Sequence, residues 1–77
     1  MKKIKYEIKK IISNIMNIKI EKINEKTNLF EELKVDSLDM IEITMAIEEK
    51  FEIEIPDSDL ENLYTIDLIV QYLQKNK

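Results

Sequence analysis

Three serines, Ser13, Ser37 and Ser58, are the candidate sites of covalent chemistry in this chain. None can be paired with the usual general base, because the 77 residues include no histidine, and cysteine is absent as well. Histidine is also the commonest metal ligand near neutral pH, and without cysteine there is neither a thiolate metal site nor a disulfide. We therefore expect no catalytic residue, no metal site and no enzymatic activity. A serine in such a chain is better suited to carry a group that another enzyme attaches.

Ser37 lies where a helix is predicted to begin. Asp36 suits the N-cap position, and Asp39 falls at the third helical position, where a carboxylate complements the exposed amides and the helix dipole. A phosphodiester on the Ser37 hydroxyl would lie beside those unpaired amides. The alternative is an ordinary serine in a first helical turn, since Asp-Ser-Leu is a common tripeptide.

The helix predicted from Asp36 to about Lys50 carries apolar residues on two faces. One stripe is the expected core face and comprises Met40, Ile43, Ile47 and Phe51. The second comprises Leu38, Ile41 and Met45 and is bordered by Glu42, Glu48 and Glu49. An exposed apolar ridge between carboxylates suits transient docking of other proteins. The alternative is that residues 19–35 fold over this second stripe and bury it.

Helical spacing also dominates the rest of the chain, which has no glycine and one proline. A first helix is predicted over residues 3–17, followed by a long connection over 19–35 with a turn at Thr27. Residues 51–55 form an extended connector, and Pro56 precedes a short helix over 57–63. Thr65 caps a last helix that ends near residue 74. We expect one all-α domain, residues 1–77, folded as a small four-helix bundle with three main helices and one short helix.

Charge is distributed unevenly along the chain. Residues 1–26 hold eight lysines and three glutamates, whereas residues 27–77 hold four lysines and thirteen acidic residues. The strongly acidic second part argues against binding to nucleic acid, which requires clustered positive charge. It favours partners with basic patches, although a solvated acidic surface would have the same composition. No apolar run is long enough to span a membrane, so a cytoplasmic protein is the expectation.

Three segments of the sequence resemble type II acyl carrier proteins. They read DSLDMIE over residues 36–42, MAIEEKF over 45–51 and IEIPD over 53–57. The tripeptide DSL at residues 36–38 is a weak motif by itself, but the three segments at this spacing form a specific one. The likeness covers nearly the whole chain, including its length and its acidic middle.

This resemblance implies a role for each matching residue. Ser37 would carry a 4'-phosphopantetheine arm donated by coenzyme A, and Asp36 would belong to the motif recognised by the transferase. The positions that contact partner enzymes match Leu38, Asp39, Ile41, Glu42, Met45, Glu48 and Glu49. The family shelters acyl chains between its helices, and an apolar lining from Ile43, Ile47, Ile55, Leu60, Leu63 and Leu73 would suit that role.

The implied function is that of a carrier and not an enzyme. The arm would hold acyl groups as thioesters and deliver them between enzymes of fatty-acid synthesis. The partners would be a phosphopantetheinyl transferase and acyl-processing enzymes with basic docking patches, and the carrier itself would be a monomer. One alternative is a specialised carrier for a polyketide, modified-lipid or aminoacyl pathway. Another, of a different class, is an unmodified helical module that binds basic partners.

Three positions depart from the family pattern. Lys34 replaces a glycine, which excludes an easy left-handed turn there and puts a cation near the phosphodiester. Thr44 stands where an aliphatic residue is usual, close to the core stripe, so its hydroxyl needs a partner, and the carbonyl four residues back is the candidate. Leu60 and Leu63 differ from the residues common at their positions and would reshape the acyl pocket.

Overall fold

The computed structural model describes residues 2–75, apart from the side chain of residue 2. Its elements are α1 (Lys2–Met16), η1 (Ile20–Lys22), α2 (Ser37–Phe51), η2 (Asp57–Asn62) and α3 (Ile66–Lys75), where η denotes a 3-10 helix. No β-strand occurs among these residues, so the all-α prediction is confirmed, with three main helices and the short η2. The single turn η1 lies in the long connection, where no helix was expected.

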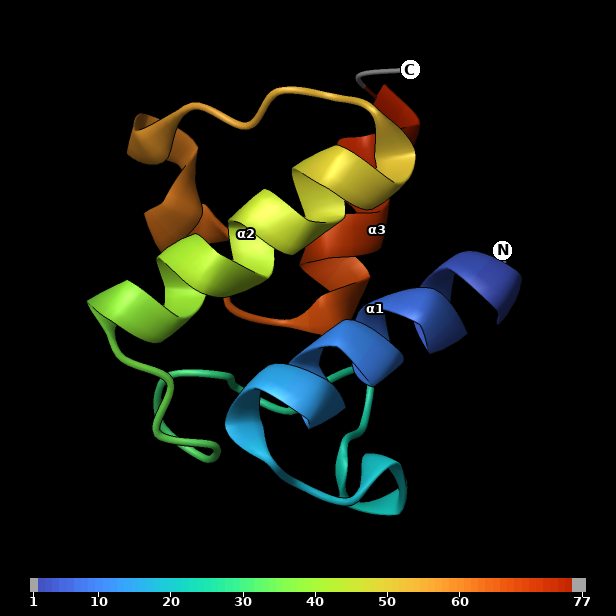
Figure 1. The fold of residues 1–77 in the computed structure, drawn as a ribbon, viewed down its shortest axis with the longest axis vertical. Helices are drawn as coiled ribbons and strands as arrows, with labels where there is room; N and C mark the ends of the chain where they lie inside the picture. Colours follow the sequence, from blue (N-terminus) through green and yellow to red (C-terminus); the bar gives the residue numbers. More distant parts are fainter. Residues whose placement is uncertain (1, 76–77) are drawn as a thin grey trace.

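The three α-helices enclose one apolar core. Figure 1 shows α1 and α2 side by side with α3 crossing behind them, and α1 contacts both of the others. Nine of the buried apolar side chains in the described residues come from the α-helices, where residues three and four apart share one side, and five come from the connecting segments. The buried apolar residues are Ile8, Ile12, Ile23, Leu29, Val35, Met40, Ile43, Ile47, Ile55, Leu63, Ile66, Ile69, Val70 and Leu73.

The connection between α1 and α2 is fastened to α1 and to the start of α3. Leu29 donates its backbone N–H to the Tyr64 carbonyl oxygen at 2.8 Å, and Asp67 donates to the Glu25 carbonyl oxygen at 3.1 Å. Lys9 Nζ lies 2.7 Å from Glu25 Oε1. The hydrogen bond from Lys9 lowers the pKa of the Glu25 carboxyl. These bonds keep the connection away from the outer face of α2, which stays exposed.

Residues 52–65 join α2 to α3. Glu52 ends α2 in a left-handed conformation, and its N–H donates to the Glu48 carbonyl oxygen. The short helix η2 ends one residue before the predicted boundary. Thr65 Oγ1 accepts a hydrogen bond from the Leu68 N–H at 3.2 Å, so the predicted cap of the last helix is confirmed.

Candidate functional site

Ser37 is the first residue of α2, and the turn before it is fixed by two reciprocal hydrogen bonds. Asp39 N–H donates to Asp36 Oδ1 at 2.8 Å, and Asp36 N–H donates to Asp39 Oδ2 at 3.3 Å. This capping box has an acidic residue at both of its positions, as the sequence predicts. It sets the direction in which α2 begins, and therefore the position of the serine.

The environment of Ser37 suits an attached phosphodiester. Ser37 and Leu38 are both exposed, and their backbone N–H groups have no hydrogen-bond partner among residues 2–75. Unpaired amides at a helix N-terminus stabilise a nearby anion, and the helix dipole adds to the effect. A phosphate on the Ser37 oxygen could therefore accept hydrogen bonds from the start of α2 without displacing any existing contact.

An apolar groove of about 260 Å³ begins beside Ser37. One wall is the first turns of α2, and the opposite wall is η2. Its lining consists of Phe30, Ser37, Met40, Ile41, Asp57, Leu60 and Glu61. The groove therefore offers apolar surface next to the serine, with carboxylates on the η2 side.

The predicted acyl-pocket residues occupy two different places. Leu60 lines the groove beside Ser37. The other five, Ile43, Ile47, Ile55, Leu63 and Leu73, are buried members of the central core. The sequence pattern predicts Met40 on the core stripe of α2 and Ile41 on the second, exposed stripe, and their place in this groove was not predicted. The spacing held a signal, because Met40 and Ile41 are three and four residues after Ser37 and so share its side of α2.

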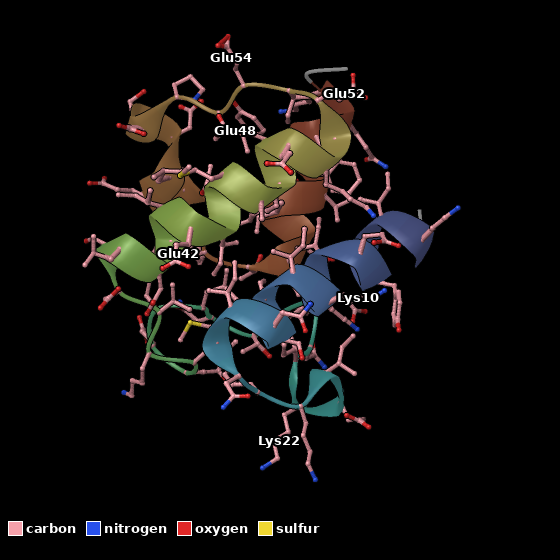
Figure 2. The ribbon with its side chains drawn as sticks, in the orientation of Figure 1. Lys10, Lys22, Glu42, Glu48, Glu52 and Glu54 are labelled. Carbon is pink, nitrogen blue, oxygen red and sulfur yellow. The ribbon has the colours of Figure 1, made fainter. Side chains whose placement is uncertain are left out.

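The second apolar stripe of α2 is exposed. Leu38, Ile41 and Met45 have 72%, 42% and 62% of their surface accessible. Glu42 and Glu49 beside them are exposed too, and Figure 2 shows Glu42 on the outer side of α2. The alternative in which residues 19–35 cover this stripe is therefore wrong. An apolar ridge bordered by exposed carboxylates runs along α2 from Ser37, and we call it the α2 ridge (Leu38, Ile41, Glu42, Met45 and Glu49).

The carboxylates of Asp39 and Glu48 are already bonded within the protein. Asp39 is part of the capping box, and Glu48 Oε2 accepts the Ile55 N–H at 2.7 Å. Both side chains are only partly accessible. Asp39 therefore shapes the surface beside Ser37, whereas Glu48 shapes the surface near the end of α2, and both add to the negative charge of the helix.

Lys34 adopts the left-handed conformation, with φ of 59°. The expectation that the loss of glycine would exclude such a turn is wrong. The residue after the turn, Val35, holds it in place, because Val35 is buried and donates its N–H to the Leu29 carbonyl oxygen at 3.0 Å. A non-glycine residue pays about 1 kcal/mol for this conformation, which the neighbouring contacts offset.

Thr44 is buried, and its Oγ1 has no hydrogen-bond partner in the described part of the chain. The predicted bond to the carbonyl four residues back is wrong. Within an α-helix that carbonyl, of Met40, already accepts the backbone N–H of Thr44, so the hydroxyl is not needed to satisfy it. The side chain instead fills core space, which leaves a polar atom unpaired among apolar neighbours.

Known proteins similar to this chain indicate its family. Residues 7–73 match the family model described as a phosphopantetheine attachment site. An acyl carrier protein of Buchnera aphidicola subsp. Schizaphis graminum is 49% identical, over 100% of this chain and 99% of its own length. One of Wolinella succinogenes is 41% identical, over 92% and 93%. This chain belongs to the acyl carrier protein family. The solved acyl carrier protein of Enterococcus faecalis has the same fold, with a TM-score of 0.82 and 29% identity over 99% of this chain and 96% of that one.

Acyl carrier proteins are carriers and not catalysts, and their prosthetic group is a covalent 4'-phosphopantetheine. This agrees with a site that has an exposed hydroxyl and apolar surface but no histidine or cysteine. Among the described residues, no helix is long and apolar enough to cross a membrane. Those residues also include no group of three or more carboxylates arranged to hold a metal ion.

Proposed function

We propose that Ser37 is the attachment point of the phosphopantetheine arm of this acyl carrier protein. The observation that carries this proposal is the exposed serine at the capped start of α2, beside free amides and at the mouth of an apolar groove. In the reaction, the Ser37 oxygen would bond to phosphorus, the pyrophosphate bond of coenzyme A would break, and adenosine bisphosphate would leave. The transferase would take the serine proton, since this chain has no histidine to do so.

The attached group supplies a thiol that holds acyl chains as thioesters. The protein's own part is to position that arm, shelter the chain and present both to enzymes. Asp36 is exposed beside the serine and would be read by the transferase. Exposed Lys34 lies three residues before Ser37, close enough along the chain to compensate part of the phosphodiester charge.

The α2 ridge would be the docking surface for the transferase and the acyl-processing enzymes. Its three apolar side chains provide area to be desolvated, and Glu42 and Glu49 attract and orient basic patches on the partner. Asp39 and Glu48 would add negative charge to this surface while their carboxylates keep the hydrogen bonds to Asp36 and Ile55. Docking that depends on exposed charges weakens as salt rises, because the Debye length falls to about 8 Å at physiological ionic strength.

An acyl chain would enter by the groove beside Ser37. From there it could extend past Leu60 toward the core residues Ile43, Ile47, Ile55, Leu63 and Leu73 if these separate to admit it. The core side chains would then serve both packing and cargo binding. In this proposal residues 1–77 form a single carrier domain that acts as a cytoplasmic monomer.

Fatty-acid synthesis is the standard role of the family and is the proposed pathway. A specialised polyketide, modified-lipid or aminoacyl carrier would use the same serine and the same ridge. An unmodified interaction module would instead function without Ser37.

Loading in vitro tests the attachment proposal. The protein is incubated with coenzyme A, magnesium and a broad-specificity phosphopantetheinyl transferase, and its intact mass is measured. We expect one phosphopantetheinyl adduct on the wild type and on Ser58→Ala, a control that removes another exposed serine. Ser37→Ala should gain nothing. An adduct on Ser37→Ala, or none on the wild type, contradicts the proposal.

A further inference from the structure

The short helix η2 forms a wall of the groove but is weakly anchored. Asp57, Leu60 and Glu61 of η2 face the groove, opposite Ser37 and Ile41. None of the six residues of η2 is buried. Segments with few buried contacts open at low free-energy cost, so the bonds that hold η2 decide how wide the groove becomes.

One bond fixes the connector that leads into η2. Glu48 Oε2 accepts the Ile55 N–H at 2.7 Å, and the Glu48 carbonyl oxygen accepts the Ile53 N–H at 3.2 Å. Figure 2 shows Glu48 between α2 and this connector, whereas Glu54 points outward. Glu48 therefore holds the extended chain against the end of α2, and with it the buried Ile55 at the base of the η2 wall.

A second bond fixes η2 itself. Tyr72 of α3 donates its hydroxyl hydrogen to Asp59 Oδ2 at 3.0 Å, and both side chains are partly buried. Asp59 lies between the groove-lining residues Asp57 and Leu60. Moving η2 outward to widen the groove would stretch this bond, because α3 is anchored in the core through Ile69 and Leu73 on either side of Tyr72.

We propose that Tyr72 and Glu48 are positioning residues that hold residues 53–62 as the movable wall of the groove and thereby set which acyl chain lengths it shelters. This rests on the proposed carrier function of Ser37. The two bonds close the wall from opposite ends, one on α3 and one on α2. Short chains fit the groove with both bonds intact, whereas longer chains require the wall to open.

Hydrogen exchange in the unloaded protein tests the first half of this inference, without any attached group. Loss of one net hydrogen bond corresponds to roughly a fivefold to tenfold change in an opening equilibrium. Tyr72→Phe and Glu48→Ala should therefore speed amide exchange of residues 53–63 by about that factor. The matched controls Tyr64→Phe and Glu49→Ala remove an exposed hydroxyl and a neighbouring exposed carboxylate, and they should leave exchange unchanged.

Conservative variants separate the hydrogen bonds from charge and from general loss of stability. Asp59→Asn keeps an acceptor oxygen for Tyr72, and Glu48→Gln keeps one for Ile55, so both should exchange like the wild type. Asp59→Ala should behave like Tyr72→Phe. Unchanged exchange in Tyr72→Phe and Glu48→Ala overturns the inference, as does an equal acceleration over all three α-helices.

Thioester protection tests the second half. Each variant is loaded with butanoyl, octanoyl or dodecanoyl groups, and the rate of thioester cleavage by neutral hydroxylamine is measured. In Tyr72→Phe, the ratio of the dodecanoyl rate to the butanoyl rate should change at least threefold from its wild-type value, whereas Tyr64→Phe should keep the wild-type ratio. A proportional change at every chain length would show a purely structural role and overturn the inference. Loading of the wild type is checked first by intact mass, and a missing adduct counts against the proposed function of Ser37 instead.

Discussion

Replacing Thr44 by valine should stabilise the fold. Thr44 is 5% exposed, and its Oγ1 has no partner in the described residues, so its desolvation on folding is uncompensated. An unpaired buried polar group costs about 1–3 kcal/mol, and valine has nearly the same shape and helix propensity as threonine. We therefore expect the free energy of unfolding to rise by about 1–2 kcal/mol. In a domain of this size each kcal/mol raises Tm by about 4–8 °C.

Urea and thermal denaturation, followed by far-ultraviolet circular dichroism, measure this change. Thr44→Ser is the control, because it keeps the hydroxyl and loses the methyl group, and it should lower stability by about 1 kcal/mol. A valine variant no more stable than the wild type would refute the reasoning. It would mean that the hydroxyl is satisfied in solution, by water or by the carbonyl of Met40.

Three further changes test other parts of the account. Lys34→Gly should raise the free energy of unfolding by about 0.5–1 kcal/mol, and with it the denaturation midpoint, because glycine adopts the left-handed turn freely. The hydrogen bond from Lys9 lowers the pKa of Glu25. The ionised Glu25 carboxylate therefore stabilises the folded protein above its unfolded-state pKa, and this stabilisation is lost as the pH falls through the folded-state pKa. Lys9→Met should therefore flatten the fall in stability between about pH 5 and 3, measured by urea titrations. Burial and the bond to Asp59 raise the pKa of Tyr72. The protonated Tyr72 hydroxyl therefore stabilises the folded protein below its unfolded-state pKa, and this stabilisation is lost above about pH 10. Tyr72→Phe should reduce that loss of stability at high pH.

The helices and their buried faces follow from local sequence. Apolar residues at helical spacing predict the core side of α2, and Asp36 with Asp39 predicts its start, because a capping box involves only four consecutive residues. The exposure of the α2 ridge could not be predicted from local sequence alone. Whether residues 19–35 cover it depends on distant hydrogen bonds such as Leu29 to Tyr64, which periodicity does not encode.

The incorrect predictions share a cause in tertiary contacts. Lys34 takes a left-handed turn because Val35 is held in the core, and the Thr44 hydroxyl, which has no partner in the described residues, is buried where α2 packs into the core. The groove beside Ser37 combines residues from the connection, from α2 and from η2. Its lining could not be read from one helix, although Met40 and Ile41 share the serine's side of α2.

The central claim is that Ser37 carries the arm on which acyl groups travel. The most direct measurement is mass spectrometry of the protein purified from the cells that naturally make it, both intact and after proteolytic digestion, before and after neutral hydroxylamine. We expect the mass of one phosphopantetheinyl group on the peptide containing Ser37, with further acyl masses that hydroxylamine removes. Protein that carries no such group, or carries it on another serine, would contradict the account.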